Sequence, residues 1–65
     1  MCEFKVYLDE AGAERIEVAK NVIVAKRKDG NVLLMNDLGT VTLVNGANIV
    51  EANTFTQEMI LKRGD

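Results

Sequence analysis

The chain has 65 residues, a net charge of −2 and 48% hydrophobic residues, with one cysteine and no histidine. A chain of this length forms a single domain, residues 1–65, with a small hydrophobic core. One cysteine excludes an internal disulfide. The acidic balance, with only two phenylalanines and one tyrosine, argues against a nucleic-acid-binding surface.

Residues 2–8 alternate between apolar and polar side chains, which is the period of a half-buried strand. The apolar residues that would share its core face are Cys2, Phe4, Val6 and Leu8. Residues 10–13 predict a turn. Residues 15–19 alternate again and predict a second strand, with Ile16 and Val18 facing inward.

The rest of the chain predicts short strands separated by turns. Asp29-Gly30 and Asn45-Gly46 lie between apolar runs and are typical of tight hairpin turns. The residues from 32 to 35 are apolar on both faces of their strand. The strands predicted in this part span residues 21–27, 32–35, 40–44, 48–52 and 58–62.

About six or seven short antiparallel strands predict an all-β fold, a small barrel-like meander. In so small a domain, only one face of each strand can point into the core. The second apolar face must then be shielded from water, and a partner subunit could shield it. Without a disulfide or a mixed Cys/His zinc site, oligomerisation is the remaining way to stabilise the domain. We therefore expect a homodimer. The candidate contact residues are Ile23, Leu33, Met35 and Ile60.

The residue types used in catalysis are scarce. Histidine and serine are both missing, which excludes Ser/His and Cys/His nucleophile pairs, and no glycine pattern matches a phosphate-binding loop. The glutamates fall mostly at polar strand positions, as expected of a solvated face. We expect no enzymatic activity. The short apolar runs, the lack of a leader and the lone thiol predict a cytoplasmic protein without a membrane segment.

Cys2 has two interpretations that the residues alone leave open. It would share a strand face with Phe4 and Val6, which favours a small apolar residue at the end of a strand. Its thiolate and the backbone nitrogen of the same residue could instead close a five-membered chelate ring on a metal. Planar N,S donation suits square-planar Ni(II) or Cu(II). One chain offers two such ligands, so a two-fold dimer would supply four.

The Met1-Cys2 opening, followed by a Phe4–Leu8 first strand in an all-β chain of about this length, resembles the CooT family of small nickel-binding proteins. The resemblance implies an accessory protein, a metallochaperone or nickel store, that serves the maturation of nickel-containing carbon monoxide dehydrogenase. It further implies a cytoplasmic homodimer that binds Ni(II) at the subunit interface through Cys2 of each chain. The implied partners are a second copy of the chain and a nickel enzyme or its maturation machinery.

Two alternatives belong to other functional classes. A small RNA-binding β-barrel would use Phe4, Tyr7 or Phe55 to stack on bases and residues 26–28, Lys-Arg-Lys, to contact phosphate. The acidic composition argues against it. An assembly subunit without a ligand is the second alternative. Nickel binding through Cys2 is the preferred hypothesis.

Overall fold

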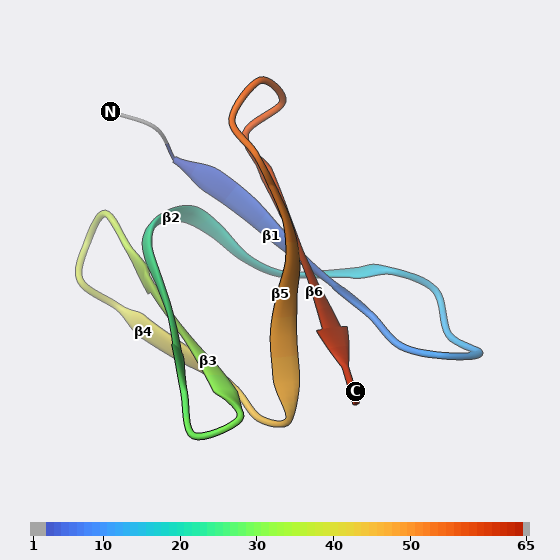
Figure 1. Cartoon of the computed structure of the whole chain (residues 1–65). Helices are drawn as coiled ribbons and strands as arrows, with labels where there is room; N and C mark the ends of the chain where they lie inside the picture. Colours follow the sequence, from blue (N-terminus) through green and yellow to red (C-terminus); the bar gives the residue numbers. More distant parts are fainter. Residues whose placement is uncertain (1–2, 65) are drawn as a thin grey trace.

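The computed structural model describes residues 3–64, which form six strands and contain no helix (Figure 1). Hence no helix within these residues could cross a membrane. Met1 and Cys2 lie outside the described residues. The strands are β1 (Phe4–Asp9), β2 (Ile16–Lys28), β3 (Asn31–Asn36), β4 (Val41–Val44), β5 (Ala47–Asn53) and β6 (Glu58–Arg63).

All six strands belong to one sheet in the order β4-β3-β2-β1-β6-β5. The two edge strands, β4 and β5, follow each other in sequence through Asn45-Gly46, where Gly46 has a φ of 64°. A sheet whose edges are joined by so short a connection must curl, and Figure 1 shows the resulting half-barrel. The predicted turn at Asn45-Gly46 therefore exists, but it joins opposite sheet edges and not two paired strands.

The expected all-antiparallel meander is wrong in one respect, because β1 and β6 pair in parallel. The chain crosses from one edge of the sheet to the other between β4 and β5, and the β5–β6 hairpin then returns toward β1. After that crossing, β6 runs in the same direction as β1. The other four strand pairings are antiparallel.

The two strands predicted at 15–19 and 21–27 form one strand, β2, of 13 residues. Its first half pairs with β1 and its second half with β3. Irregular register occurs on both sides of Asn21, opposite β1 and between Val22 and Val24 opposite β3. Such bulges bend a strand and increase its twist. The bend lets β2 pass through both parts of the curled sheet without a break.

The core fills the concave side of the sheet. Its buried residues are Val6, Leu8, Val22, Val32, Leu34, Val44, Ala47, Met59 and Leu61. The predicted inward face of the first strand is confirmed for Phe4, Val6 and Leu8, since Val6 and Leu8 are buried and Phe4 packs against them. Val18 also packs on the core, but Ile16 is 51% exposed, contrary to expectation. The start of β2 pairs only with β1, so Ile16 lies at an open edge.

Four apolar side chains gather on the convex face of β3 and β4, and we call them the outer patch: Leu33, Met35, Val41 and Leu43. They form the cross-strand pairs Leu33–Leu43 and Met35–Val41. Their sequence neighbours Val32, Leu34 and Val44 point into the core, so alternation places these four on the opposite face. Val41 and Leu43 are 52% and 55% exposed. The patch is the apolar second face expected from the sequence.

Ile60 departs from that expectation. It was predicted to contribute to a subunit contact, but it is only 6% exposed. It lies between Tyr7 on β1 and Glu51 on β5, in the middle of the sheet, and outside the concave core cluster. The chain itself covers Ile60, which leaves little surface for a partner. Ile23 remains 37% exposed in the bulge of β2.

Candidate functional site

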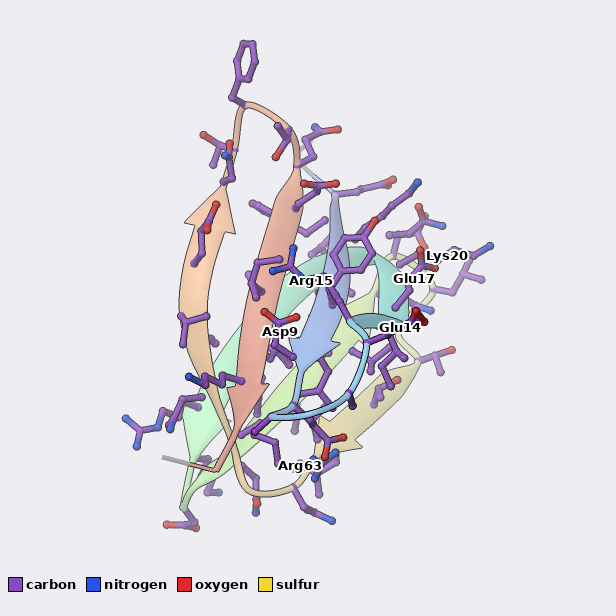
Figure 2. The ribbon with its side chains drawn as sticks, turned by 90° about the vertical axis from the view of Figure 1, so that its right-hand side faces the viewer. Asp9, Glu14, Arg15, Glu17, Lys20 and Arg63 are labelled. Atoms are coloured by element: carbon purple, nitrogen blue, oxygen red, sulfur yellow. The ribbon has the colours of Figure 1, made fainter. Side chains whose placement is uncertain are left out.

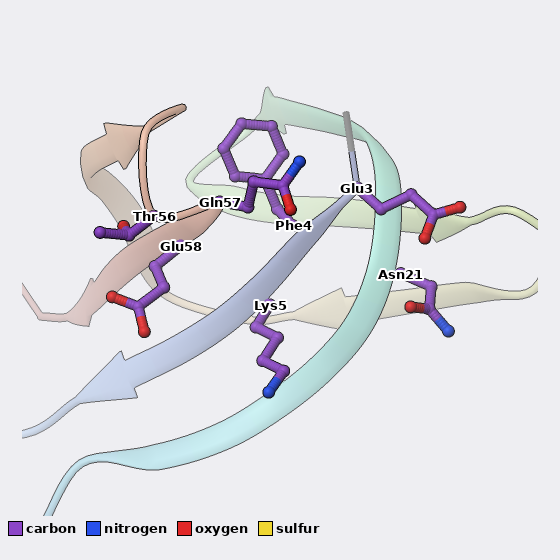
Figure 3. Close-up of a pocket in the computed structure, with 7 residues that line it drawn as sticks. All are labelled: Glu3, Phe4, Lys5, Asn21, Thr56, Gln57 and Glu58. Atoms are coloured by element: carbon purple, nitrogen blue, oxygen red, sulfur yellow. The ribbon is translucent and has the colours of Figure 1, made fainter. Parts of the chain in front are cut away.

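A hollow of about 360 Å³ lies at the start of β1, where the described chain begins (Figure 3). Its lining residues are Glu3, Phe4, Lys5, Asn21, Thr56, Gln57 and Glu58. The predicted metal ligand, Cys2, lies outside the described residues. Glu3, the first described residue, is one of the residues that line the hollow.

Two strained backbone positions border the hollow from opposite sides of β1. Asn21 has a φ of 55° and Gln57 a φ of 60°, in the left-handed region that few residues other than glycine adopt. Asn21 belongs to β2 and Gln57 directly precedes β6, the two neighbours of β1 in the sheet. Figure 3 shows them on either side of the first strand, with Lys5 between them.

Backbone hydrogen bonds hold both left-handed residues in place. The Gln57 carbonyl accepts the N–H of Lys5 at 3.0 Å, and the Asn21 carbonyl accepts the N–H of Asp37 at 3.0 Å. The first bond ties the β5–β6 turn to β1, and the second ties the bend of β2 to the β3–β4 turn. Their backbone conformation is thus set by neighbouring strands.

The side-chain amides of these two residues have no hydrogen-bond partner within residues 3–64. Other asparagines serve the turns: Asn36 accepts two backbone N–H groups and Asn53 accepts two more. The asparagine at position 21 departs from this pattern. It and Gln57 are exposed and present N–H₂ groups at the rim of the hollow.

The sequence interpretation missed both residues. Asparagine tolerates the left-handed region, but position 21 falls inside a predicted strand and not in a turn. Gln57 carries no signal at all, because turns of this kind usually place glycine or asparagine at a left-handed position. Only the tertiary structure brings the two amides beside the start of β1.

The charged groups at the hollow have both signs. Lys5 contributes an ammonium group, and Glu3 and Glu58 contribute carboxylates. Lys5 and Glu58 are register partners on the parallel strands β1 and β6, yet no ion pair forms between them in the described part of the chain. The lining therefore carries two carboxylates against one ammonium group, beside neutral amides.

No complete metal centre exists among the described residues. Across residues 3–64, no three His, Cys, Asp or Glu side chains gather closely enough to hold an ion. Cys2, the metal ligand expected from the sequence, lies outside these residues, so its role stays a prediction.

The clearest charge pairing lies far from the hollow, in the connection between β1 and β2 (Figure 2). Arg15 and Asp9 form a bidentate ion pair there, with Nε 2.6 Å from Oδ1. The hydrogen bond from Arg15, aided by the charges of Arg15 and Lys62, lowers the pKa of Asp9 despite some desolvation. The same hydrogen bond raises the pKa of Arg15. This pair closes a loop and does not belong to the hollow.

The residues proposed for RNA binding do not form one surface. Phe55 is 95% exposed at the β5–β6 turn, whereas residues 26–28 lie at the end of β2. Figure 1 places the β5–β6 turn and the β2–β3 turn at opposite ends of the molecule. Phe4 packs against the core, and Tyr7 is half-buried. Stacking and phosphate contacts are thus separated.

Comparison with known proteins supports one family. The family model described as CO dehydrogenase accessory protein CooT matches residues 1–62. A crystal structure from Carboxydothermus hydrogenoformans, of a protein assigned to CooT, superposes with a TM-score of 0.82. It is 22% identical and covers 98% of this chain and 100% of its own, which establishes a shared fold. No curated protein matches the chain.

Proposed function

Because the chain belongs to the CooT family of CO dehydrogenase accessory proteins, we propose that it is a nickel-binding accessory protein of the cytoplasm. It binds Ni(II) through Cys2 at the interface of a homodimer. Its role is to store nickel or deliver it during maturation of a nickel enzyme such as carbon monoxide dehydrogenase. Such a role is non-catalytic, in keeping with the lack of histidine and serine.

The observation that carries this proposal is the family match, which extends to residue 1 and so includes Cys2. The composition supports it, because the chain has no histidine and no second cysteine to offer. Nickel favours nitrogen and sulfur donors in a plane, and Cys2 with its own backbone nitrogen provides that pair. Four donors require two copies of the chain.

The outer patch supports dimer formation. The Asn21 carbonyl binds the N–H of Asp37 in the turn between β3 and β4, the two strands that carry the patch. The bend of β2 that borders the start of β1 therefore lies near one end of the patch. A two-fold contact through the patch would supply the second copy of the chain that the donor count requires.

Nickel titration of the purified protein tests the proposal. We expect thiolate-to-nickel charge-transfer absorbance that saturates at one nickel per two chains, with protons released because the thiol must ionise. Cys2→Ala should abolish the absorbance and the binding while leaving the circular dichroism spectrum and melting temperature unchanged. Nickel binding by Cys2→Ala with the affinity of the unmodified protein would overturn the proposal.

A further inference from the structure

We propose that Asn45 is a site of spontaneous deamidation, and that Arg63 and Asn31 set its rate through the peptide group that they hold. The backbone nitrogen of Gly46 converts the side-chain amide of Asn45 to a carboxylate, with water as the only other reactant. The site is the connection between β4 and β5, and the inference is independent of nickel binding.

The first argument is access to the attacking nitrogen. Deamidation requires the backbone nitrogen of the next residue to reach the asparagine side chain, and a side chain on that next residue obstructs the approach. Asn45 is the only asparagine that precedes a glycine. Apart from the chain neighbours of Gly46, no described residue lies within 4 Å of the place where its Cβ would be. Both residues are exposed. The other asparagines precede Val, Asp, Ile or Thr: Asn21, Asn31, Asn36, Asn48 and Asn53.

The second argument is that side chains hold both ends of the peptide group between Asn45 and Gly46. Nη1 of Arg63 donates to the Asn45 carbonyl oxygen at 2.6 Å. The Gly46 N–H donates to Oδ1 of Asn31 at 3.1 Å. Figure 2 shows Arg63 at this end of the molecule. A carboxylate oxygen of Glu10 lies 3.6 Å from Nε of Arg63, where it helps to hold the guanidinium and offsets part of its charge.

The two contacts act on the reaction in opposite directions. The Gly46 nitrogen attacks after it has lost its proton, and the negative charge is then shared with the Asn45 carbonyl oxygen. The guanidinium of Arg63 stays protonated and stabilises this charge, which accelerates the reaction. The hydrogen bond to Asn31 retains the proton and keeps the nitrogen in place, which slows it. Arg63 and Asn31 are thus positioning residues that act through one peptide group.

The reaction proceeds in two steps. The Gly46 nitrogen forms a bond to Cγ of Asn45 and the Cγ–Nδ2 bond breaks, so that Nδ2 leaves as ammonia with the proton lost from Gly46. A cyclic imide remains, and water opens it at either carbonyl carbon. Opening at Cγ gives aspartate. Opening at the main-chain carbon gives isoaspartate, which lengthens the backbone by one carbon.

The place of the connection gives the modification a structural effect. Only Asn45 and Gly46 separate β4 from β5, and the flanking residues Val44 and Ala47 are both buried in the core. A longer backbone between two core residues should displace them, so we expect the isoaspartate form to melt at a lower temperature. Asn45→Asp carries the same new charge on a backbone of normal length and should melt close to the unmodified protein.

Incubation of the purified protein at mildly alkaline pH, followed by peptide mass spectrometry and an ammonia assay, tests the proposal. We expect a gain of one mass unit at Asn45 before any other asparagine. Arg63→Gln should slow the conversion about tenfold, whereas Arg63→Lys keeps the charge and should retain most of the rate. Asn31→Ala should accelerate it. Asn45→Gln would need a larger ring and should stay unmodified at this position.

The same incubation in urea separates the fold from the local sequence. The contacts of Arg63 and Asn31 are lost there, so Arg63→Gln, Asn31→Ala and the unmodified protein should convert at equal rates. Equal rates in the folded proteins, checked by circular dichroism, or differences that persist in urea would exclude a role for Arg63 and Asn31. If the folded protein converts another asparagine first, or leaves Asn45 intact, the proposed site is wrong.

Discussion

Arg15 donates two parallel hydrogen bonds to Asp9, from Nε to Oδ1 at 2.6 Å and from Nη2 to Oδ2 at 2.9 Å. The pair joins the end of β1 to the residue before β2 and so closes the connection between them. Bidentate arginine–carboxylate pairs are among the strongest charged hydrogen bonds in proteins. This pair is the best-defined electrostatic feature of the chain among residues 3–64.

The Asp9–Arg15 pair predicts a small loss of stability in acid. The pKa of Asp9 is lowered in the folded protein from its ordinary 3.8. Its contribution is therefore fully present above the unfolded value and is lost as the pH falls through the folded value. Asp9→Asn should remove this part of the pH dependence. A ¹³C NMR titration of the Asp9 carboxyl group checks the direction, and a midpoint at or above 3.8 would contradict it.

Shortening the buried side chain of Leu61 should create a cavity in the core and lower the stability of the fold. Its side chain is 0% exposed and packs within the central cluster, so Leu61→Ala should lower the free energy of unfolding by about 2–5 kcal/mol. Leu38 is 86% exposed, and Leu38→Ala should change the free energy by less than about 0.5 kcal/mol. Urea denaturation of both variants measures the difference. Equal effects would mean that the core is placed wrongly.

Gln57 predicts a gain of stability on substitution by glycine. A residue with a Cβ is destabilised by about 1–2 kcal/mol in the left-handed conformation, and glycine avoids this cost. The greater conformational freedom of glycine in the unfolded chain offsets part of that stabilisation. Gln57→Gly should raise the free energy of unfolding by up to about 1 kcal/mol. Gln57→Ala keeps the Cβ and should give no gain. A glycine variant that is less stable than the alanine variant would contradict the strain at this position.

We expect two copies of the chain to meet at the outer patch, and Leu43 allows this to be tested. It is 55% exposed in the outer patch, and Leu43→Glu would place a charge in the proposed contact. We expect this variant to sediment as a monomer while keeping its circular dichroism spectrum. Val50 on β5 is 56% exposed and lies outside the patch, so Val50→Glu is the matched control and should remain dimeric. Dimers of equal strength in both variants would exclude the outer patch.

Local patterns in the sequence predict much of this fold. The alternation of Phe4, Val6 and Leu8 gives the inward face of β1, because side chains of a strand point alternately to its two sides. Asp29-Gly30 marks the β2–β3 turn, since both residues there have positive φ angles. Runs that are apolar on both faces predict a second apolar surface, which exists as the outer patch.

Composition and alternation predict the all-β class, most strand positions and the scarcity of catalytic groups. The long bent β2, the parallel pairing of β1 with β6 and the burial of Ile60 have no counterpart in these patterns. These depend on how far the sheet curls, which is a sum of small twists over all strands and has no local signal. The placement of Asn21 and Gln57 on either side of the first strand depends on the strand order. Residues 36 positions apart become neighbours of one hollow because β2 and β6 lie on either side of β1.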